Sequence, residues 1–333
     1  LAALLTNFTD ARAYLADEGD LILVASPHGK VPELGDGPFQ QPLVAADLAH
    51  VGVKSLRDMQ DTLVMNRPAL EAYLALYPSR MNSDMYPLLR LEAPRARFQR
   101  AQVSDFHALG GAPWPLIRHL GGPPPRTGMD ADADRLSLAS VRQAAAANEL
   151  FAALVEGRRE KPNAMSELDA LQVEAMRGLA MDCALDQRPQ RTATMIFSLV
   201  SNTAAHLDPP RLQRMWGKPE WVTCAANDAT VAAAFGLAAA VSEDRHEDVI
   251  RLGQGLLEGE HGPALLQEGE VAFYLMGAMQ YAALSAGQPE LAQQLVQRYW
   301  TRMDRQAQGS GSLRLLALLA SRAEERSTPQ ANQ

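Results

Sequence analysis

From Leu136 to Arg326 the apolar residues recur at helical spacing, and short breaks rich in Gly, Pro, Asp or Asn interrupt the pattern at intervals. This periodicity restricts the fold more than any other feature, because it predicts helices that each bury one face. Hydrophobic residues make up 47% of the chain but aromatic residues only 6%, and this balance favours helices over sheet. We therefore predict an α-helical domain over residues 136–326 and a disordered polar tail over residues 327–333.

Two segments of this region repeat one pattern at an offset of 43 residues. Residues 239–252 and residues 282–295 each contain a small-residue helix end, a short turn and the start of an amphipathic helix. That offset is typical of helical-hairpin repeats, so the region is similar to tetratricopeptide-type arrays. Ser166 with Asp169 predicts a capping box, and Asn227 or Asp228 can cap the next helix.

The first hundred residues have a different pattern. Residues 11–16 and the apolar run 21–25 predict two strands of an antiparallel hairpin around a turn at residues 17–20. The uncharged second strand is typical of a strand that is buried on both faces. Helices are expected over residues 43–50, 55–65 and 68–76.

Residues 78–98 are predicted to be extended, because Pro78, Pro87 and Pro94 disfavour a helix. Residues 99–135 contain Gly and Pro clusters and predict a linker that packs loosely on its neighbours. The fold class is thus α+β overall and mostly α: an α/β part over residues 1–98, a linker, and the helical domain.

Asn82 to Arg95 reads Asn-Ser-Asp-Met-Tyr-Pro-Leu-Leu-Arg-Leu-Glu-Ala-Pro-Arg, and Gly19 to Ser26 reads Gly-Asp-Leu-Ile-Leu-Val-Ala-Ser. The segment from Asn82 resembles the closing motif of the spermidine/spermine synthase family, especially its bacterial membrane-fused members. The segment from Gly19 is similar to that family's last core strand. Departures from the motif are Met85 in place of an Asp, Arg90 in place of a Glu, and Leu91 in place of an aromatic residue.

The resemblance implies the C-terminal remnant of a Rossmann-type methyltransferase-like sheet in a polyamine synthase. Such enzymes transfer an aminopropyl group from decarboxylated S-adenosylmethionine to a diamine. The resemblance places the nucleotide loop and the catalytic Asp upstream of Leu1, so we expect no cofactor site and no activity in this chain. Tyr14, Asn82 and Asp84 are the candidate substrate-binding residues, although Asn82 and Asp84 also suit plain turn chemistry.

Two other interpretations stay open. The chain can be a non-enzymatic helical scaffold with a degenerate synthase remnant, or part of another S-adenosylmethionine-dependent methyltransferase. The upstream coding sequence distinguishes the three. In each case the expected partners are a protein bound by the helical domain and, for the synthase, the missing N-terminal half of its own domain.

Composition excludes several classes of function. The net charge of -8 argues against nucleic-acid binding. No run reaches the roughly 18 apolar residues of a membrane span, so a cytoplasmic location, or the cytoplasmic side of a membrane-anchored parent, is expected. The histidines lack metal-ligand spacing, no metal is expected, and Cys183 and Cys224 are interpreted as reduced core residues. Phe273, Tyr274, Met276, Met279 and Tyr281 are interpreted as core packing within one helix.

Overall fold

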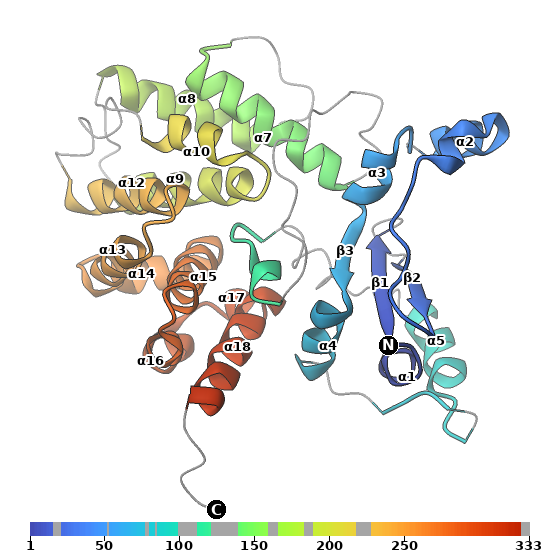
Figure 1. Cartoon of the computed structure of the whole chain (residues 1–333). Helices are drawn as coiled ribbons and strands as arrows, with labels where there is room; N and C mark the ends of the chain where they lie inside the picture. The colour runs from blue at the N-terminus through green and yellow to red at the C-terminus, as the bar shows by residue number, and fades with distance from the viewer. Residues whose placement is uncertain are drawn as a thin grey trace, which may run out of the picture. The chain divides into compact units, whose positions relative to one another are not determined.

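The computed structural model describes residues 1–15, 21–51, 53–76, 80–83, 85–98, 112–120, 139–158, 166–182, 189–217 and 228–327. Over these ranges the chain is mostly α-helical with one small antiparallel sheet, as the predicted α+β class requires (Figure 1). It divides into two compact units. The described residues up to Phe98, together with Pro115 to Leu120, belong to unit 1; Ala112 to Trp114 and the residues from Arg142 on belong to unit 2.

The sheet of unit 1 has β1 (Asp10–Leu15) in the centre, between β2 (Leu21–Ser26) and β3 (Leu63–Asn66) (Figure 1). Both neighbours run antiparallel to β1. The β1–β2 register runs from the pair Asp10–Ser26 to the pair Leu15–Leu21, which confirms the predicted hairpin. The β1–β3 register shifts between Ala13 and Tyr14.

Short helices precede, separate and follow the strands of this sheet along the chain. Arg67 at the start of α4 donates hydrogen bonds to the carbonyl oxygens of Leu5 and Phe8, which ties α4 to the end of α1. The predicted helices at residues 43–50 and 68–76 are confirmed as α2 and α4. The bounds are α1 Ala2–Asn7, η1 Gly37–Gln40, α2 Pro42–His50, α3 Leu56–Asp61, α4 Arg67–Leu76, α5 Leu88–Phe98 and η2 Leu116–Arg118.

Two predictions that concern this sheet were wrong. The helix expected over residues 55–65 ends at Asp61, because the next residues pair with β1 as β3. Pairing with a distant strand therefore overrides local helix propensity. Strand β2 is not buried on both faces: Ile22 is 53% exposed and Val24 is 40% exposed. The described part of unit 1 covers only one face of this strand.

The extended segment predicted over residues 78–98 was also wrong, because its second half is helix α5 with Pro94 inside. Pro94 removes the hydrogen bond to the Arg90 carbonyl. Both residues are exposed, so water can take the missing position, and the Arg, Glu and Ala residues around Pro94 favour helix. The predicted loose linker fails where it is described, since Trp114, Leu116 and Ile117 are buried.

Unit 2 is a succession of helices. Asp208 and Asp228 begin α10 and α12 as N-caps, since the Asp208 carboxylate accepts from the backbone N–H of Arg211 at 2.9 Å and that of Asp228 accepts from Thr230 and Val231. The bounds are α7 Ala139–Val155, α8 Glu167–Asp182, α9 Pro189–Ala204, α10 Pro209–Trp216, α12 Ala229–Ser242, α13 His246–Glu258, α14 Gly262–Gln267, α15 Gly269–Ser285, α16 Pro289–Tyr299, η4 Trp300–Arg302, α17 Arg305–Gln308 and α18 Gly311–Ser327.

The two segments that repeat one pattern, residues 239–252 and 282–295, form equivalent turns. One turn lies between α12 and α13 and the other between α15 and α16. Asp244 and Gly287, which are 43 positions apart, both have a positive φ, of 53° and 69°. The N–H of Arg245 donates to the Ala240 carbonyl at 2.9 Å, and that of Gln288 donates to Ala283 at 2.8 Å. Both are the bonds of a Schellman-type helix end. The two turns are thus equivalent at the level of backbone hydrogen bonds.

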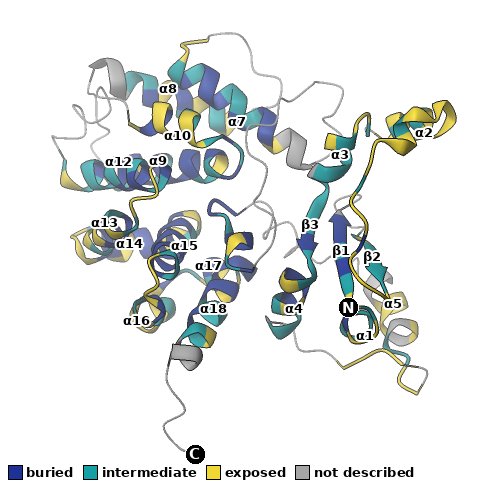
Figure 2. Cartoon of the chain, in the orientation of Figure 1, coloured by how far each residue is buried: buried dark blue, intermediate teal, exposed yellow. Residues whose placement is uncertain are grey.

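Helix α15 forms the centre of unit 2. It packs against α9, α13, α16 and α18, and most of its residues are buried, as Figure 2 shows. Tyr274, Met276, Met279 and Tyr281 are among the buried residues, which confirms the predicted core packing. A helix that is apolar all round needs neighbours on every side. In the described ranges no helix is both long and apolar enough to cross a bilayer.

Candidate functional site

Tyr14, the first predicted substrate-binding residue, is buried in the sheet of unit 1. It lies on the same face of β1 as Arg12, whose guanidinium pairs with Glu33 at 2.5 Å. The hydrogen bonds that Arg12 donates to the Glu33 carboxylate raise the pKa of Arg12, and the nearby Tyr14 oxygen acts in the same direction. The Tyr14 hydroxyl itself completes no hydrogen bond of normal geometry with any described residue. Its surroundings are those of a packed sheet face.

Asn82, the second candidate, is exposed and directly precedes a turn. The turn is closed by reciprocal backbone hydrogen bonds between Ser83 and Tyr86, and the Ser83 hydroxyl also accepts from the Tyr86 N–H. Arg80 donates to the Tyr86 hydroxyl at 3.1 Å. These bonds are turn chemistry between Ser83 and Tyr86, next to Asn82. Asp84 lies outside the described residues, so the structure places one candidate in the core and one on the surface.

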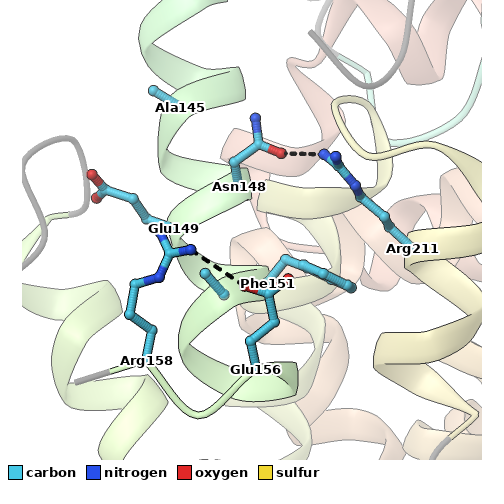
Figure 3. A pocket seen from close by; sticks show the side chains of 8 residues that line it. Ala145, Asn148, Glu149, Phe151, Glu156, Arg158 and Arg211 are labelled. Carbon is cyan, nitrogen blue, oxygen red and sulfur yellow. Dashed lines mark hydrogen bonds and ion pairs between the residues drawn. The ribbon is translucent and has the colours of Figure 1, made fainter. Parts of the chain in front are cut away.

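Unit 2 contains a groove of about 370 Å³ between α7 and α10 (Figure 3). One face of α7 forms its floor through residues spaced at helical intervals, and Arg211 of α10 forms the opposite wall. Gly157, with a φ of 70°, turns the chain after α7 so that Arg158 returns over the groove. The lining residues are Ala145, Asn148, Glu149, Phe151, Ala152, Glu156, Arg158 and Arg211.

The polar side chains of the groove are held in place. Arg211 donates to the Asn148 side-chain oxygen at 2.7 Å, across the groove (Figure 3). Arg158 pairs with Glu156 at 3.4 Å. The guanidiniums of Arg211 and Arg214 lie 5.9 Å and 5.2 Å from the centre of the Phe151 ring, within the range of cation–π attraction. Packing and pairing thus fix two cations, an aromatic ring and an amide around one cavity.

The lining of this groove is polar and charged around one aromatic ring. Its described lining has no Ser, Cys, His, Tyr or Lys side chain, and its ionisable groups are two carboxylates and two guanidiniums. Arg158 and Arg211 use only some of their five N–H donors and can donate to the carbonyls of a ligand backbone. Glu149 and Glu156 balance their charge, so the lining is neutral overall. A neutral polypeptide fits this lining better than a polyanion does.

Sequence reasoning missed the groove. The signal was present in α7, where Asn148 and Glu149 interrupt an Ala-rich helix and align with Ala145 and Ala152 on one face. The opposite wall had no signal, because Arg211 comes from a helix that meets α7 only in the tertiary structure. Cys183 and Cys224 lie outside the described residues.

A comparison with family models, curated proteins and solved structures finds no match to this chain. In the part of the chain that the structure describes, no group of three or more His, Cys, Asp or Glu side chains is arranged to hold a metal ion. The functional assignment therefore depends on the geometry of the two units.

Proposed function

We propose that the chain is the C-terminal part of an aminopropyltransferase-like protein. Unit 1 contributes the edge of the transferase domain, which is of the Rossmann type. Unit 2 is a tetratricopeptide-like module that docks a protein partner. The nucleotide loop and the catalytic base belong to a portion of the protein outside this chain, so the chain alone is inactive.

The exposure of β2 carries this proposal. Strand β2 has no charged residue, and a strand of this composition belongs inside a sheet that is covered on both faces. Here it is the outermost strand, and Ile22 and Val24 are exposed. No backbone hydrogen bond joins its outer edge to another described strand. Soluble proteins normally protect such an edge with charge, proline or a cover. A further strand and a further helical layer, supplied by the rest of the domain, would provide that protection.

The groove of unit 2 supports the second half of the proposal. Stacked helical hairpins characteristically present binding grooves to other polypeptides. The equivalent turns at Asp244 and Gly287 support such a stack, and the neutral groove beside Arg211 offers donors for a peptide backbone.

Two measurements test the transferase assignment. Calorimetric titration of this chain with methylthioadenosine should give only heats of dilution, and tight binding would show that the nucleotide site is inside the chain. The protein encoded by the complete reading frame should transfer aminopropyl groups from decarboxylated S-adenosylmethionine to a diamine.

A pair of substitutions sharpens the second measurement. Val24→Asp should be tolerated in this chain, where the side chain is half-exposed, but should abolish transfer by the complete protein, where β2 is buried. Leu43→Asp, on the exposed helix α2, is the matched control and should leave transfer intact. Equal activity of the two variants would contradict the proposed place of β2.

A non-enzymatic scaffold is the second candidate, and the segment at Asn82 favours it. Met85 stands where the family motif has an Asp and is 95% exposed. The turn around it is closed by backbone hydrogen bonds between Ser83 and Tyr86. A complete protein that binds a partner through unit 2 but transfers no aminopropyl group would identify the scaffold.

A further inference from the structure

Trp114 occupies a notch in the surface of α15. A Cβ atom added to Gly277 would lie 2.0 Å from two ring carbons of Trp114, so only glycine at this position lets the indole come so close. The Trp114 ring centre lies 5.0 Å from that of Phe273 and 6.0 Å from that of Tyr274. Phe197 supports the Tyr274 ring from α9 at 5.6 Å. We call these four residues, Phe197, Phe273, Tyr274 and Gly277, the aromatic notch.

The segment that fills the notch has the form of a linear ligand. Ala112 to Trp114 is irregular chain, yet it belongs to unit 2, whereas Pro115 and the η2 residues that follow belong to unit 1. Pro113 and Pro115 flank the tryptophan and limit its backbone freedom. Recognition of proline-flanked residues by aromatic-lined grooves is a recurrent mode of peptide binding, because the peptide loses little conformational entropy. Trp114 is only 3% exposed, so the anchor is fully inserted.

The fit of this segment is incomplete in its polar contacts. The Trp114 indole N–H and the Tyr274 hydroxyl are both buried, and neither has a hydrogen-bond partner in the described ranges. Both groups gave up hydrogen bonds with water, and no described residue replaces them, which weakens the net attraction of an otherwise well-packed indole. A ligand that offers an acceptor to the Tyr274 hydroxyl would bind the same notch more tightly.

We propose that the aromatic notch is a binding site for a linear peptide with a proline-flanked aromatic residue, and that Ala112–Trp114 occupies it as an internal competitor. The partner is therefore a polypeptide with an exposed Pro-Trp-Pro-like segment. Its binding displaces Trp114 from the notch. This site is separate from the groove at Arg211, and it does not depend on the transferase assignment.

Fluorescence anisotropy with a labelled peptide of residues 112–117, Ala-Pro-Trp-Pro-Leu-Ile, tests the proposal. The Trp114→Ala variant has an empty notch and should bind the peptide at least tenfold more tightly than the wild-type chain does. A peptide with Ala in place of Trp should not bind. Equal binding by the wild-type chain and the variant would overturn the competition.

Two glycine substitutions in the Trp114→Ala background locate the site. Gly277→Ala fills the notch and should weaken peptide binding at least tenfold. Gly255→Ala, in α13 with no atom within 4 Å, is the matched control and should leave the affinity unchanged. Equal affinities for the two variants would place the peptide elsewhere and overturn the proposal.

Trp114→Leu keeps an apolar side chain in the notch. It is a second test variant in case Trp114→Ala does not fold. We expect it to bind the peptide more weakly than Trp114→Ala and more tightly than the wild-type chain. If the folded variants, verified by circular dichroism, bind no peptide, the proposal is rejected. Aminopropyl transfer by the complete protein is a separate readout, so that result leaves the proposed function unaffected.

Discussion

The equivalent turns at Asp244 and Gly287 lead to a sharp prediction, because the same backbone conformation is occupied by different residues. Gly287 has a φ of 69° and no atom within 4 Å of a Cβ placed on it. Gly287→Ala therefore meets no steric contact, and only the left-handed backbone opposes it. At Asp244, with a φ of 53°, the chain already accepts that cost.

The expected magnitudes follow from backbone energetics. A left-handed conformation costs a residue with a Cβ about 1–2 kcal/mol. Replacing Gly restricts the unfolded chain and returns about 0.4–1 kcal/mol. Gly287→Ala should thus lower the free energy of unfolding by about 1 kcal/mol. Asp244→Gly should change it by less than about 0.5 kcal/mol, because Asp tolerates this conformation better than Ala.

Urea unfolding followed by circular dichroism at constant m-value measures both effects. For an m-value of about 2–3 kcal/mol/M, Gly287→Ala should lower the midpoint by about 0.3–0.5 M. Gly255→Ala is the control, since this exposed glycine lies inside α13, and it should raise the free energy of unfolding by about 0.5–1 kcal/mol. The reasoning is refuted if Gly287→Ala is as stable as the wild-type chain, or if the two alanine variants lose equal stability.

Three further predictions concern buried polar groups. Tyr274→Phe removes an unpaired hydroxyl and should raise the unfolding free energy by about 1 kcal/mol, whereas Tyr299→Phe loses the hydrogen bond to Glu258 and should lower it by about 1 kcal/mol in the same urea assay. Gln280→Met replaces a buried amide that has no partner among the described residues, and should stabilise by roughly 1–3 kcal/mol; a lower melting temperature would contradict this. Burial lowers the pKa of His206 from 6.5 to about 4, so the unfolded chain binds the proton first. The contribution of His206 to the unfolding free energy should be fully present above about pH 6.5 and should fall by up to about 3 kcal/mol as the pH drops toward 4. Urea midpoints at pH 7 and pH 5 measure this loss in the wild-type chain. The His206→Gln variant should lack the part of the loss that comes from this site.

Interactions within a few residues could be predicted from the sequence. The hairpin of β1 and β2, the capping box at Ser166 and the N-cap at Asp228 each depend on neighbours in the chain. The like turns at Asp244 and Gly287 belong to the same class, because their hydrogen bonds span at most five residues. Local chemistry of this kind is readable without the fold.

The tertiary structure decided whatever depends on a distant partner. Strand β3 formed where helix was predicted, since β1 offered its edge, and α5 accommodated Pro94 because its surface is open to water. The pairing of Asn148 with Arg211 and the notch at Gly277 bring together residues that are far apart in the sequence. The exposure of Ile22 and Val24 depends on which elements cover β2. The chain alone determined which segments become helices and turns, and packing determined which of their faces meet, because burial is a property of the folded neighbourhood and not of the residue.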